Sequence, residues 1–251
     1  MDLKNSKTIA VRPHKTVYQC GDSVVKVFNE SHPKADVFNE ALNQARVEET
    51  GLNIPKVLEV TQVDGKWALE MEHVEGDTLA HLMKQHPEKL DEYLELFVDL
   101  QLEMHSKKAP LLTKLKDKLV RQIDSLSTEL DATARYELHT RLDGMPKHTK
   151  VCHGDFNPTN IVIGKKGTFI LDWSHATQGN ASADAAMTYL LFSLESETIA
   201  DKYLTLFCQK SDTAKQYVQQ WLPIVAAAQM TKKKAEEQEL LHRWINVIEY
   251  Q

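Results

Sequence analysis

Two carboxylates and one amide, Asp155, Asn160 and Asp172, bracket a stretch with the pattern of a β-hairpin. Its strands would be residues 161–163 and 168–171, separated by a turn of glycine and lysine. Because the loop before a hairpin and the turn after it lie at the same end, the three side chains can converge. Carboxylate and amide oxygens suit Mg²⁺ held jointly with substrate phosphates. The stretch therefore predicts a magnesium–phosphate site, with one carboxylate left to orient an attacking hydroxyl.

Short motifs occur in a fixed order around this hairpin. The sequence His-Gly-Asp ends at Asp155, an asparagine follows five positions later, and an Asp-Trp pair begins at Asp172. This arrangement resembles the catalytic loop and the metal-binding aspartate of the protein-kinase-like superfamily. The middle glycine and the tryptophan after Asp172 look more like the aminoglycoside phosphotransferase and choline kinase family than like protein kinases.

The resemblance implies a role for each polar residue. Asn160 and Asp172 would hold Mg²⁺ on the phosphates of ATP, and the catalytic Asp155 would receive or orient the acceptor hydroxyl. Asp184 follows Gly179 as in the tail of the family motif, but we favour an N-cap for the next helix. His153 is interpreted as a residue that braces the loop, with a general base as the alternative.

Upstream, Lys26 lies between valines in a predicted strand. A lysine among apolar neighbours on a buried strand needs an anionic partner, whereas an edge lysine would point to water. The resemblance places here the lysine that pairs with the ATP phosphates. Glu40 would be its partner because it lies in the middle of the following helix, while Glu48 and Glu49 lie near the helix end.

The resemblance also implies an extended linker that binds adenine through main-chain groups, and we assign this to Glu72 and Val74. One departure concerns residues 12–16, which contain no glycine where protein kinases have a glycine-rich phosphate loop. Lys15 or Thr16 could replace the missing main-chain donors, and surface exposure is the alternative. Since the chain contains no GxxxxGK[ST] motif, a P-loop enzyme is excluded.

The surrounding pattern predicts an α+β, protein-kinase-like fold with two lobes. Strands are expected at 17–19, 24–28, 56–63 and 66–74, with a helix at 33–49. These elements would form a small antiparallel N-lobe, residues 1–73, that binds the nucleotide. Residues 74–251 would form a mainly helical C-lobe with the catalytic loop, the metal site and the acceptor-binding helices. Helical spacing of apolar residues recurs near 90–100, 112–128, 131–142 and after 183.

Composition limits the partners. No apolar stretch approaches the length needed to cross a bilayer, and the polar first residues contain no secretory signal, so we expect a cytoplasmic protein. The net charge of −6 argues against nucleic acid as a partner, and the short basic run 232–234 is expected on a solvated helix face. The three cysteines are widely spaced and contain no CxxC pair, so structural thiols are expected.

The predicted activity is the transfer of the γ-phosphate of Mg-ATP to a hydroxyl of a small molecule such as an aminoglycoside, an amino alcohol like choline, or a sugar. A catalytically inactive pseudokinase that binds a nucleotide or partner is the alternative, disfavoured because the polar centres are present. A protein kinase is disfavoured because no Ala-Pro-Glu segment separates Asp172 from Asp184.

Acidic residues of the C-terminal helices could form a wall for a cationic acceptor, although solvated faces are preferred; they are Glu195, Glu197, Asp201, Glu236, Glu237 and Glu239. Trp221 and Trp244 are expected in the core.

Overall fold

The computed structural model describes residue 3 and residues 6–246, which form two compact units. The first unit contains the described residues of Met1–His86 together with Pro158–Ala176. The second contains those of Pro87–Asn157 and Thr177–Gln251. The hairpin that bears Asn160 and Asp172 thus groups with the N-terminal residues, whereas Asp155 belongs to the helical unit. The division at residues 73 and 74 into a nucleotide lobe and an acceptor lobe stays a prediction.

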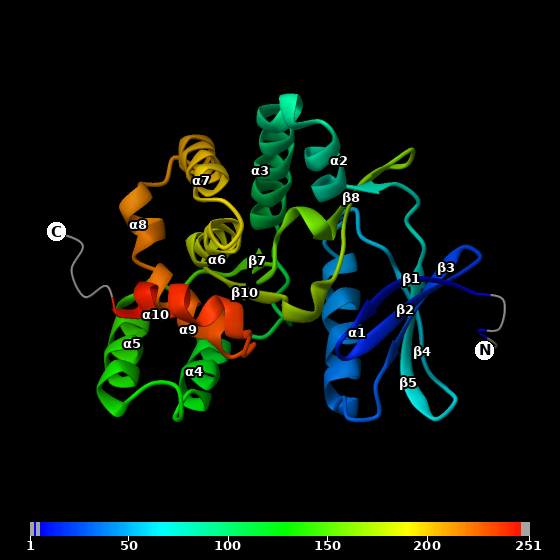
Figure 1. Ribbon diagram of the computed structural model, residues 1–251, viewed down its shortest axis with the longest axis horizontal. Coiled ribbons are helices and arrows are strands. Elements are labelled where there is room, and N and C mark those ends of the chain that lie inside the picture. Colours follow the sequence, from blue (N-terminus) through cyan, green and yellow to red (C-terminus); the bar gives the residue numbers. More distant parts are fainter. Residues whose placement is uncertain (1–2, 4–5, 247–251) are drawn as a thin grey trace. The chain divides into compact units, whose positions relative to one another are not determined.

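A five-stranded antiparallel sheet forms the body of the first unit (Figure 1). The sheet order is β1-β2-β3-β5-β4, and the strands are β1 (Lys7–Arg12), β2 (Lys15–Cys20), β3 (Ser23–Phe28), β4 (Val57–Val63) and β5 (Lys66–Glu72). Asp64 and Gly65 join β4 to β5 with φ angles of 49° and 78°. Two such left-handed residues match the twist of the flanking strands, which explains the Asp-Gly pair.

Helix α1 (Lys34–Glu48) packs beside this sheet (Figure 1). Val37 and Ala41 on the helix share an apolar cluster with Phe28 of β3 and with Leu69 and Met71 of β5. These residues are spaced by four on the helix and by two on the strand, so each element turns one apolar face to the other. This packing fixes α1 against β3, which carries Lys26.

A second, three-stranded sheet of the first unit has the order β6-β8-β9. Its strands are β6 (Asp77–Thr78), β8 (Ile161–Gly164) and β9 (Gly167–Ile170), and α2 (Leu79–Gln85) follows β6. Gly164 permits the close approach of the chain at residues 75–76, because a Cβ atom there would collide with the main-chain oxygen of Glu75. The Ile170 N–H donates to the Asn53 carbonyl at 3.0 Å, which ties the β8–β9 hairpin to the N-terminal part of the chain.

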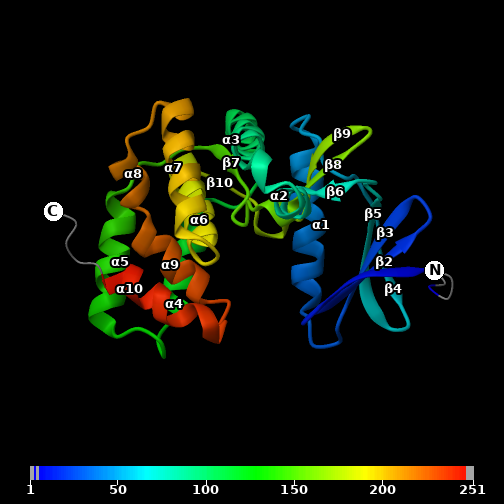
Figure 2. The same ribbon diagram turned by 45° about the horizontal axis from the view of Figure 1, so that its top comes forward.

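The second unit is mainly helical (Figure 2). Its α-helices are α3 (Leu90–Ser106), α4 (Leu115–Ser125), α5 (Ala132–Gly144), α6 (Ala181–Ser193), α7 (Glu197–Ser211), α8 (Lys215–Gln219), α9 (Leu222–Met230) and α10 (Gln238–Asn246). Two short strands, β7 (Lys150–Cys152) and β10 (Thr177–Gly179), pair antiparallel. Every residue of α9 is buried, as expected for a helix that is apolar all round and packs among α4, α5, α6 and α10.

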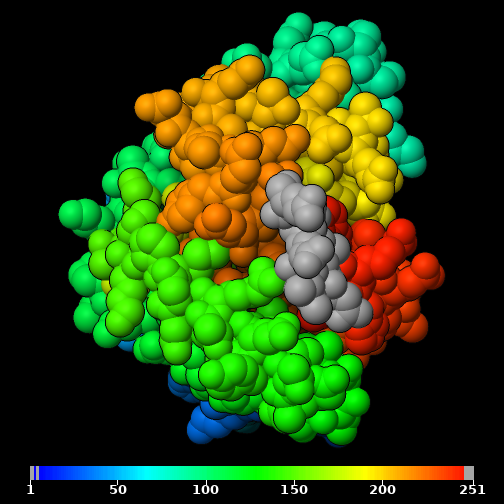
Figure 3. Space-filling model, turned by 90° about the vertical axis from the view of Figure 1, so that its left-hand side faces the viewer, coloured from blue at the N-terminus to red at the C-terminus, as the bar shows by residue number. Residues whose placement is uncertain are grey.

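The face of this unit in Figure 3 shows α5 in green, α7 and α8 in yellow to orange, and α10 in red. Trp221 is fully buried, which confirms its expected place in the core. The observed α+β architecture, with an antiparallel N-terminal sheet and a helical remainder, is the predicted fold class. None of the described helices combines the length and the hydrophobicity needed to span a membrane.

Candidate active site

A buried ion pair connects β3 to α1 in the first unit. Lys26 of β3 is 8% exposed and Glu40 of α1 is 5% exposed. The Lys26 Nζ donates a hydrogen bond to Glu40 Oε1 at 2.6 Å. The structure thus brings together the two residues that the sequence proposed as partners, and the alternative of a lysine that points to water is wrong.

Two further charged groups complete a network around this pair. Asp172 Oδ1 lies 3.5 Å from Lys26 Nζ, and Asp172 Oδ2 accepts a hydrogen bond from Lys15 Nζ at 3.4 Å. The same Lys15 Nζ lies 3.6 Å from Glu40 Oε1. Burial would lower the pKa of Lys26, but the negative charges of Asp172 and Glu40 outweigh burial and raise this pKa above its ordinary value. Lys26 therefore stays charged.

Lys15 belongs to this site, although the sequence left its position open. Its side chain is 19% exposed and leaves β2 toward the two carboxylates. In β2, Val17 pairs with Lys26 of β3, so Lys15 lies two positions away on the same face of the sheet. The sequence could have predicted this pairing, because the short turn between β2 and β3 determines which residues lie opposite each other.

The β8–β9 hairpin holds Asn160 and Asp172 near each other. The N–H of Leu171 donates to the main-chain oxygen of Asn160 at 2.7 Å. Asp172 has a left-handed backbone with a φ of 60°, a conformation that aspartate tolerates better than most residues. The next residue, Trp173, is fully buried and donates its Nε1–H to the Ile170 carbonyl at 3.0 Å. The buried tryptophan thus anchors the turn that presents the Asp172 carboxylate.

The donor set fits a magnesium ion that is shared with phosphates. Asn160 and Asp172 supply an amide oxygen and a carboxylate, which are hard ligands. Within the described part of the chain, no group of three or more histidine, cysteine, aspartate or glutamate residues could hold a metal ion. A cation at this hairpin would therefore need phosphate oxygens or water for its remaining ligands, as Mg²⁺ in nucleotide sites does.

The predicted adenine linker begins at the end of β5. The Glu72 N–H donates to the Lys56 carbonyl, and the His73 N–H donates to the Asp22 carbonyl, both at 2.9 Å. Neighbouring residues thus direct their main-chain groups to opposite sides, as in any extended chain. Val74 follows where regular structure ends.

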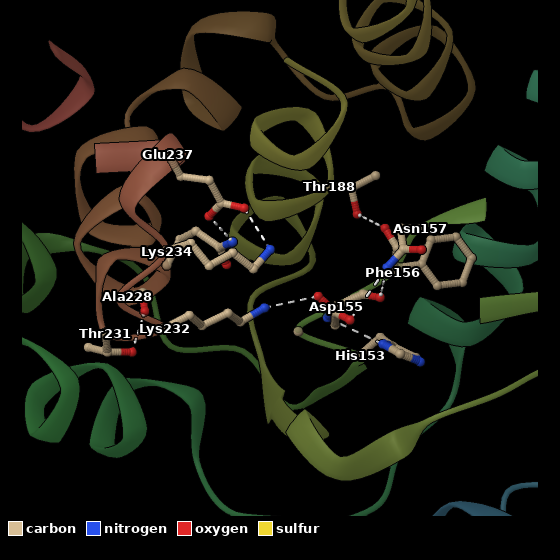
Figure 4. Close-up of polar contacts among 12 residues, drawn as sticks. His153, Asp155, Phe156, Asn157, Thr188, Ala228, Thr231, Lys232, Lys234 and Glu237 are labelled. Carbon is tan, nitrogen blue, oxygen red and sulfur yellow. Dashed lines mark hydrogen bonds and ion pairs between the residues drawn. The ribbon is translucent and has the colours of Figure 1, made fainter. Parts of the chain in front are cut away.

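The catalytic-loop candidate lies in the second unit (Figure 4). The Asp155 N–H donates to His153 Nδ1 at 3.3 Å, and Asn157 Nδ2 donates to the Asp155 carbonyl at 2.9 Å. His153 is fully buried and its ring packs against Phe156. These contacts give His153 a bracing position in the loop.

Asp184 holds the backbone of the same loop, and its predicted role as an N-cap is wrong. The N-cap of α6 is Asn180, whose Oδ1 accepts from the Ser182 N–H at 2.9 Å. Asp184 is 2% exposed, and its carboxylate accepts from the Gly154 N–H at 2.7 Å and from His105 Nε2 at 3.0 Å.

The pKa of Asp184 reflects these donors. Burial would raise this pKa, but the hydrogen bond and charge of His105 and the Gly154 N–H lower it below its ordinary value. Gly154 has a φ of 77°, which explains the glycine in the middle of the motif. The buried carboxylate thus fixes the left-handed backbone immediately before Asp155.

Lys232 is the main correction to the expected site. The run 232–234 was expected on a solvated helix face; its residues are exposed as expected, but they lie in the turn between α9 and α10. The Lys232 Nζ donates to Asp155 Oδ1 at 3.1 Å, and the two side chains are 29% and 27% exposed (Figure 4). No local sequence signal indicated this contact, because the two residues are 77 positions apart.

Residues 14–221 match the model of the phosphotransferase enzyme family, and the chain belongs to this family. A search of curated proteins found no match. An apo thermostable mutant of the aminoglycoside phosphotransferase APH(4)-Ia is similar in fold, with a TM-score of 0.74 and 14% identity over 98% of this chain and 94% of that chain. Another thermostable mutant of that enzyme, in a ternary complex with AMP-PNP and hygromycin B, has a TM-score of 0.70 and 15% identity over 96% and 90%.

A choline/ethanolamine kinase family protein from Mesorhizobium loti has a TM-score of 0.67 and 14% identity over 98% of this chain and 88% of that chain. The low identities make these structures evidence for the fold. Together with the family match, they confirm the resemblance to aminoglycoside phosphotransferases and choline kinases and the protein-kinase-like fold. The protein is a phosphotransferase.

Proposed function

We propose that this protein transfers the γ-phosphate of ATP, bound with Mg²⁺, to a hydroxyl of a small molecule. The observation that carries the proposal is the network of Lys26, Glu40, Lys15 and Asp172 in the first unit. The ammonium groups of Lys15 and Lys26 both lie at the Asp172 carboxylate. This arrangement suits a nucleotide, because phosphate oxygens can replace the carboxylate as the partner of the two lysines. The solved relatives with AMP-PNP or ADP support ATP as the donor.

Each group in the first unit then has a task. Lys26, anchored by Glu40, binds the phosphates, and Lys15 replaces the main-chain donors that a glycine-rich loop would supply. Asn160 and Asp172 would hold the metal ion, which neutralises charge on the phosphates. Glu72 and Val74 would bind the adenine through main-chain groups.

In the second unit, Asp155 would accept a hydrogen bond from the acceptor hydroxyl and orient it for attack. Phosphoryl transfer depends on positioning and charge neutralisation, so the protein needs no covalent nucleophile. The nearby Cys152 has no such role, because burial raises the pKa of its thiol well above the ordinary value. Asp184 and His153 hold the backbone on which the position of Asp155 depends.

The test is the thermal stabilisation by ATP, with and without Mg²⁺, of the wild type, Asp172→Asn and Asp64→Asn. Asp64 is an exposed residue of the same unit with a similar left-handed backbone, so Asp64→Asn controls for the substitution itself. A ligand at 100 times its Kd stabilises the folded state by about 2.7 kcal/mol. We expect a Mg²⁺-dependent shift in the wild type and in Asp64→Asn, and a weaker shift in Asp172→Asn.

Two results would refute the proposal. One is the absence of any shift with ATP in a wild type that melts cooperatively, which would favour a pseudokinase without nucleotide binding. The other is an equal Mg²⁺-dependent shift in the wild type and in Asp172→Asn, which would remove Asp172 from the metal site.

A further inference from the structure

Three consecutive lysines follow α9, and each has a different partner. Lys232 Nζ donates to Asp155 Oδ1 at 3.1 Å. Lys233 Nζ lies 3.4 Å from Glu129 Oε1 and its side chain is 74% exposed. Lys234 Nζ donates to Glu237 Oε1 at 2.6 Å. Of these three lysines, Lys232 therefore faces the carboxylate that we assign to the acceptor hydroxyl (Figure 4).

Hydrogen bonds fix the turn that carries Lys232. The N–H groups of Lys232 and Lys233 donate to the Gln229 and Met230 carbonyls at 3.0 Å. Lys233 has a left-handed backbone with a φ of 53°, which is uncommon for a residue with a long side chain. Such a conformation persists where the surrounding structure imposes it.

Side chains from neighbouring segments also hold this turn. Gln122 of α4 donates through Nε2 to the Ala228 carbonyl and to Thr231 Oγ1, both at 3.4 Å. Gln229 donates through Nε2 to Glu237 Oε2 at 2.7 Å, and both residues are buried. The fold thus builds the position from which Lys232 reaches Asp155, so this contact is more than a chance surface ion pair.

Asp155 also interacts electrostatically with a second basic side chain, Lys118. Lys118 of α4 is partly buried, and burial followed by the charge of Lys232 lowers its pKa to about 8, although Asp184 and Asp155 act in the opposite direction. The charge of Arg121, one helical turn further, also lowers this pKa. Among the carboxylates, Asp184 is already bound to His105, and Glu237 is bound to Lys234.

This charge balance disfavours a cationic acceptor. A lysine bonded to Asp155 competes with the acceptor hydroxyl for the same carboxylate oxygens. A second cation brought to Asp155 would be repelled by Lys232 and Lys118 in a partly desolvated place. An anionic group beside the hydroxyl would instead attract Lys232 and release Asp155 Oδ1 for the hydroxyl.

We propose that the acceptor carries an anionic group, a carboxylate or a phosphate ester, near the hydroxyl that is phosphorylated, and that Lys232 binds this group. This inference rests on the proposed function and names its substrate class. It separates this protein from an enzyme for polycationic acceptors. Lys232 then determines specificity, because its partner changes from Asp155 to the acceptor.

The test uses four probes that share sugar hydroxyls and differ in charge: D-glucose, D-glucosamine, D-gluconate and D-glucose 6-phosphate. Their binding is measured by thermal shift at millimolar concentration in the presence of Mg²⁺ and AMP-PNP, and ADP release with ATP follows for each probe that binds. The proteins are the wild type, Lys232→Ala, Lys232→Arg and Lys233→Ala. Lys233→Ala is the matched control, since it removes the neighbouring lysine that contacts Glu129.

We expect the anionic probes to bind more tightly than glucose and glucosamine. The preference should fall by about tenfold in Lys232→Ala, the equivalent of one charge-assisted hydrogen bond. It should be retained in Lys232→Arg and Lys233→Ala. Gluconate and glucose 6-phosphate distinguish a carboxylate from a phosphate ester as the preferred group.

Three results would overturn the inference: tighter binding of glucosamine than of the anions, an unchanged anion preference in Lys232→Ala, or no binding of either anion to a protein that binds AMP-PNP. In each case nucleotide binding persists, so the proposed function stands while the acceptor class fails. Absence of nucleotide binding would instead refute the proposed function itself.

Discussion

The buried pair of Lys26 and Glu40 allows a quantitative test of the proposed nucleotide site. We consider Lys26→Met, Glu40→Gln and the double variant. Removing one partner of a buried ion pair costs about 3–5 kcal/mol, because a charge remains without compensation. Here the cost is smaller, since Lys15 Nζ lies 3.6 Å from Glu40 and Asp172 lies 3.5 Å from Lys26.

We therefore expect each single variant to lose about 2–3 kcal/mol of the free energy of unfolding, below the range for an isolated buried pair. The double variant leaves Lys15 and Asp172 as one neutral pair at 3.4 Å. Its loss should also be about 2–3 kcal/mol, which corresponds to a coupling energy of about 2–3 kcal/mol between residues 26 and 40.

The assay is urea unfolding at pH 7, followed by tryptophan fluorescence. Trp173 is fully buried beside Asp172 in sequence and reports on the first unit. Since two compact units can unfold in separate transitions, the first unit's transition is fitted by itself. In unfolding, the double variant should be more stable than the sum of the two single losses would give. ATP binding is the second readout, and the double variant should bind ATP no better than Lys26→Met.

The pH dependence has a definite sign. The folded-state pKa of Lys26 is raised above 10.5 by Asp172 and Glu40 against the effect of burial. Its stabilisation is therefore fully present below the pKa of the unfolded chain and is lost only as pH rises through the higher folded pKa. The coupling should not change between neutral pH and about pH 9, well below the ordinary lysine pKa. A coupling below about 0.5 kcal/mol at pH 7 would show that these groups behave as exposed charges, and our reasoning would be wrong.

Three further predictions concern single positions. Lys15→Ala should change the free energy of unfolding by less than about 1 kcal/mol, because the attraction of Lys15 to Glu40 and Asp172 is offset by repulsion from Lys26. In a titration, the same variant should bind ATP about tenfold more weakly. Asp184→Asn should be less stable than the wild type by about 2–4 kcal/mol at pH 7, because the Asp184 carboxylate accepts hydrogen bonds from two donors. In urea unfolding, this difference in stability should narrow below about pH 4, as acidification protonates Asp184 in the wild type through its lowered folded-state pKa. In the same assay, Gly164→Ala should lose more than about 2 kcal/mol of the free energy of unfolding, because the new Cβ would collide with the Glu75 main chain. Gly144→Ala, where no atom lies close to the added Cβ, should gain up to about 1 kcal/mol. Equal effects of the two substitutions would contradict the close approach at Gly164.

Elements with a buried face could be predicted from the sequence. Strands β3 and β5 and helix α1 were expected within about two residues of their observed bounds. β3 is a short apolar run beside a turn, β5 follows an Asp-Gly turn, and the apolar residues of α1 recur at helical spacing. β1 was not predicted as a separate strand, since nearly all its residues are exposed and it shows no buried period. The short elements α2 and β10 carry too few residues for any period to be evident.

The predictable part of the site is the part fixed by local order along the chain. Asn160 and Asp172 bracket one hairpin, and Lys26 and Glu40 follow from a strand and the next helix. Lys232 depends instead on which distant turn lies opposite Asp155, which no local pattern encodes. The buried contacts of Asp184 likewise depend on tertiary packing, although its order after Gly179 in the family motif already indicated a place in the site.

In both units, a carboxylate that we assign to ligand binding is already bonded to lysine. Asp172 contacts Lys15 and Lys26, and Asp155 contacts Lys232. An incoming anion would not need to remove the full hydration shell of an ammonium group, because each lysine is already partly desolvated and ordered. The lysine would only exchange one anionic partner for another. Much of the cost of ordering these long side chains is then met during folding. The same reasoning links the two proposals, since phosphates would release Asp172 for a metal ion just as an anionic acceptor would release Asp155 for the hydroxyl.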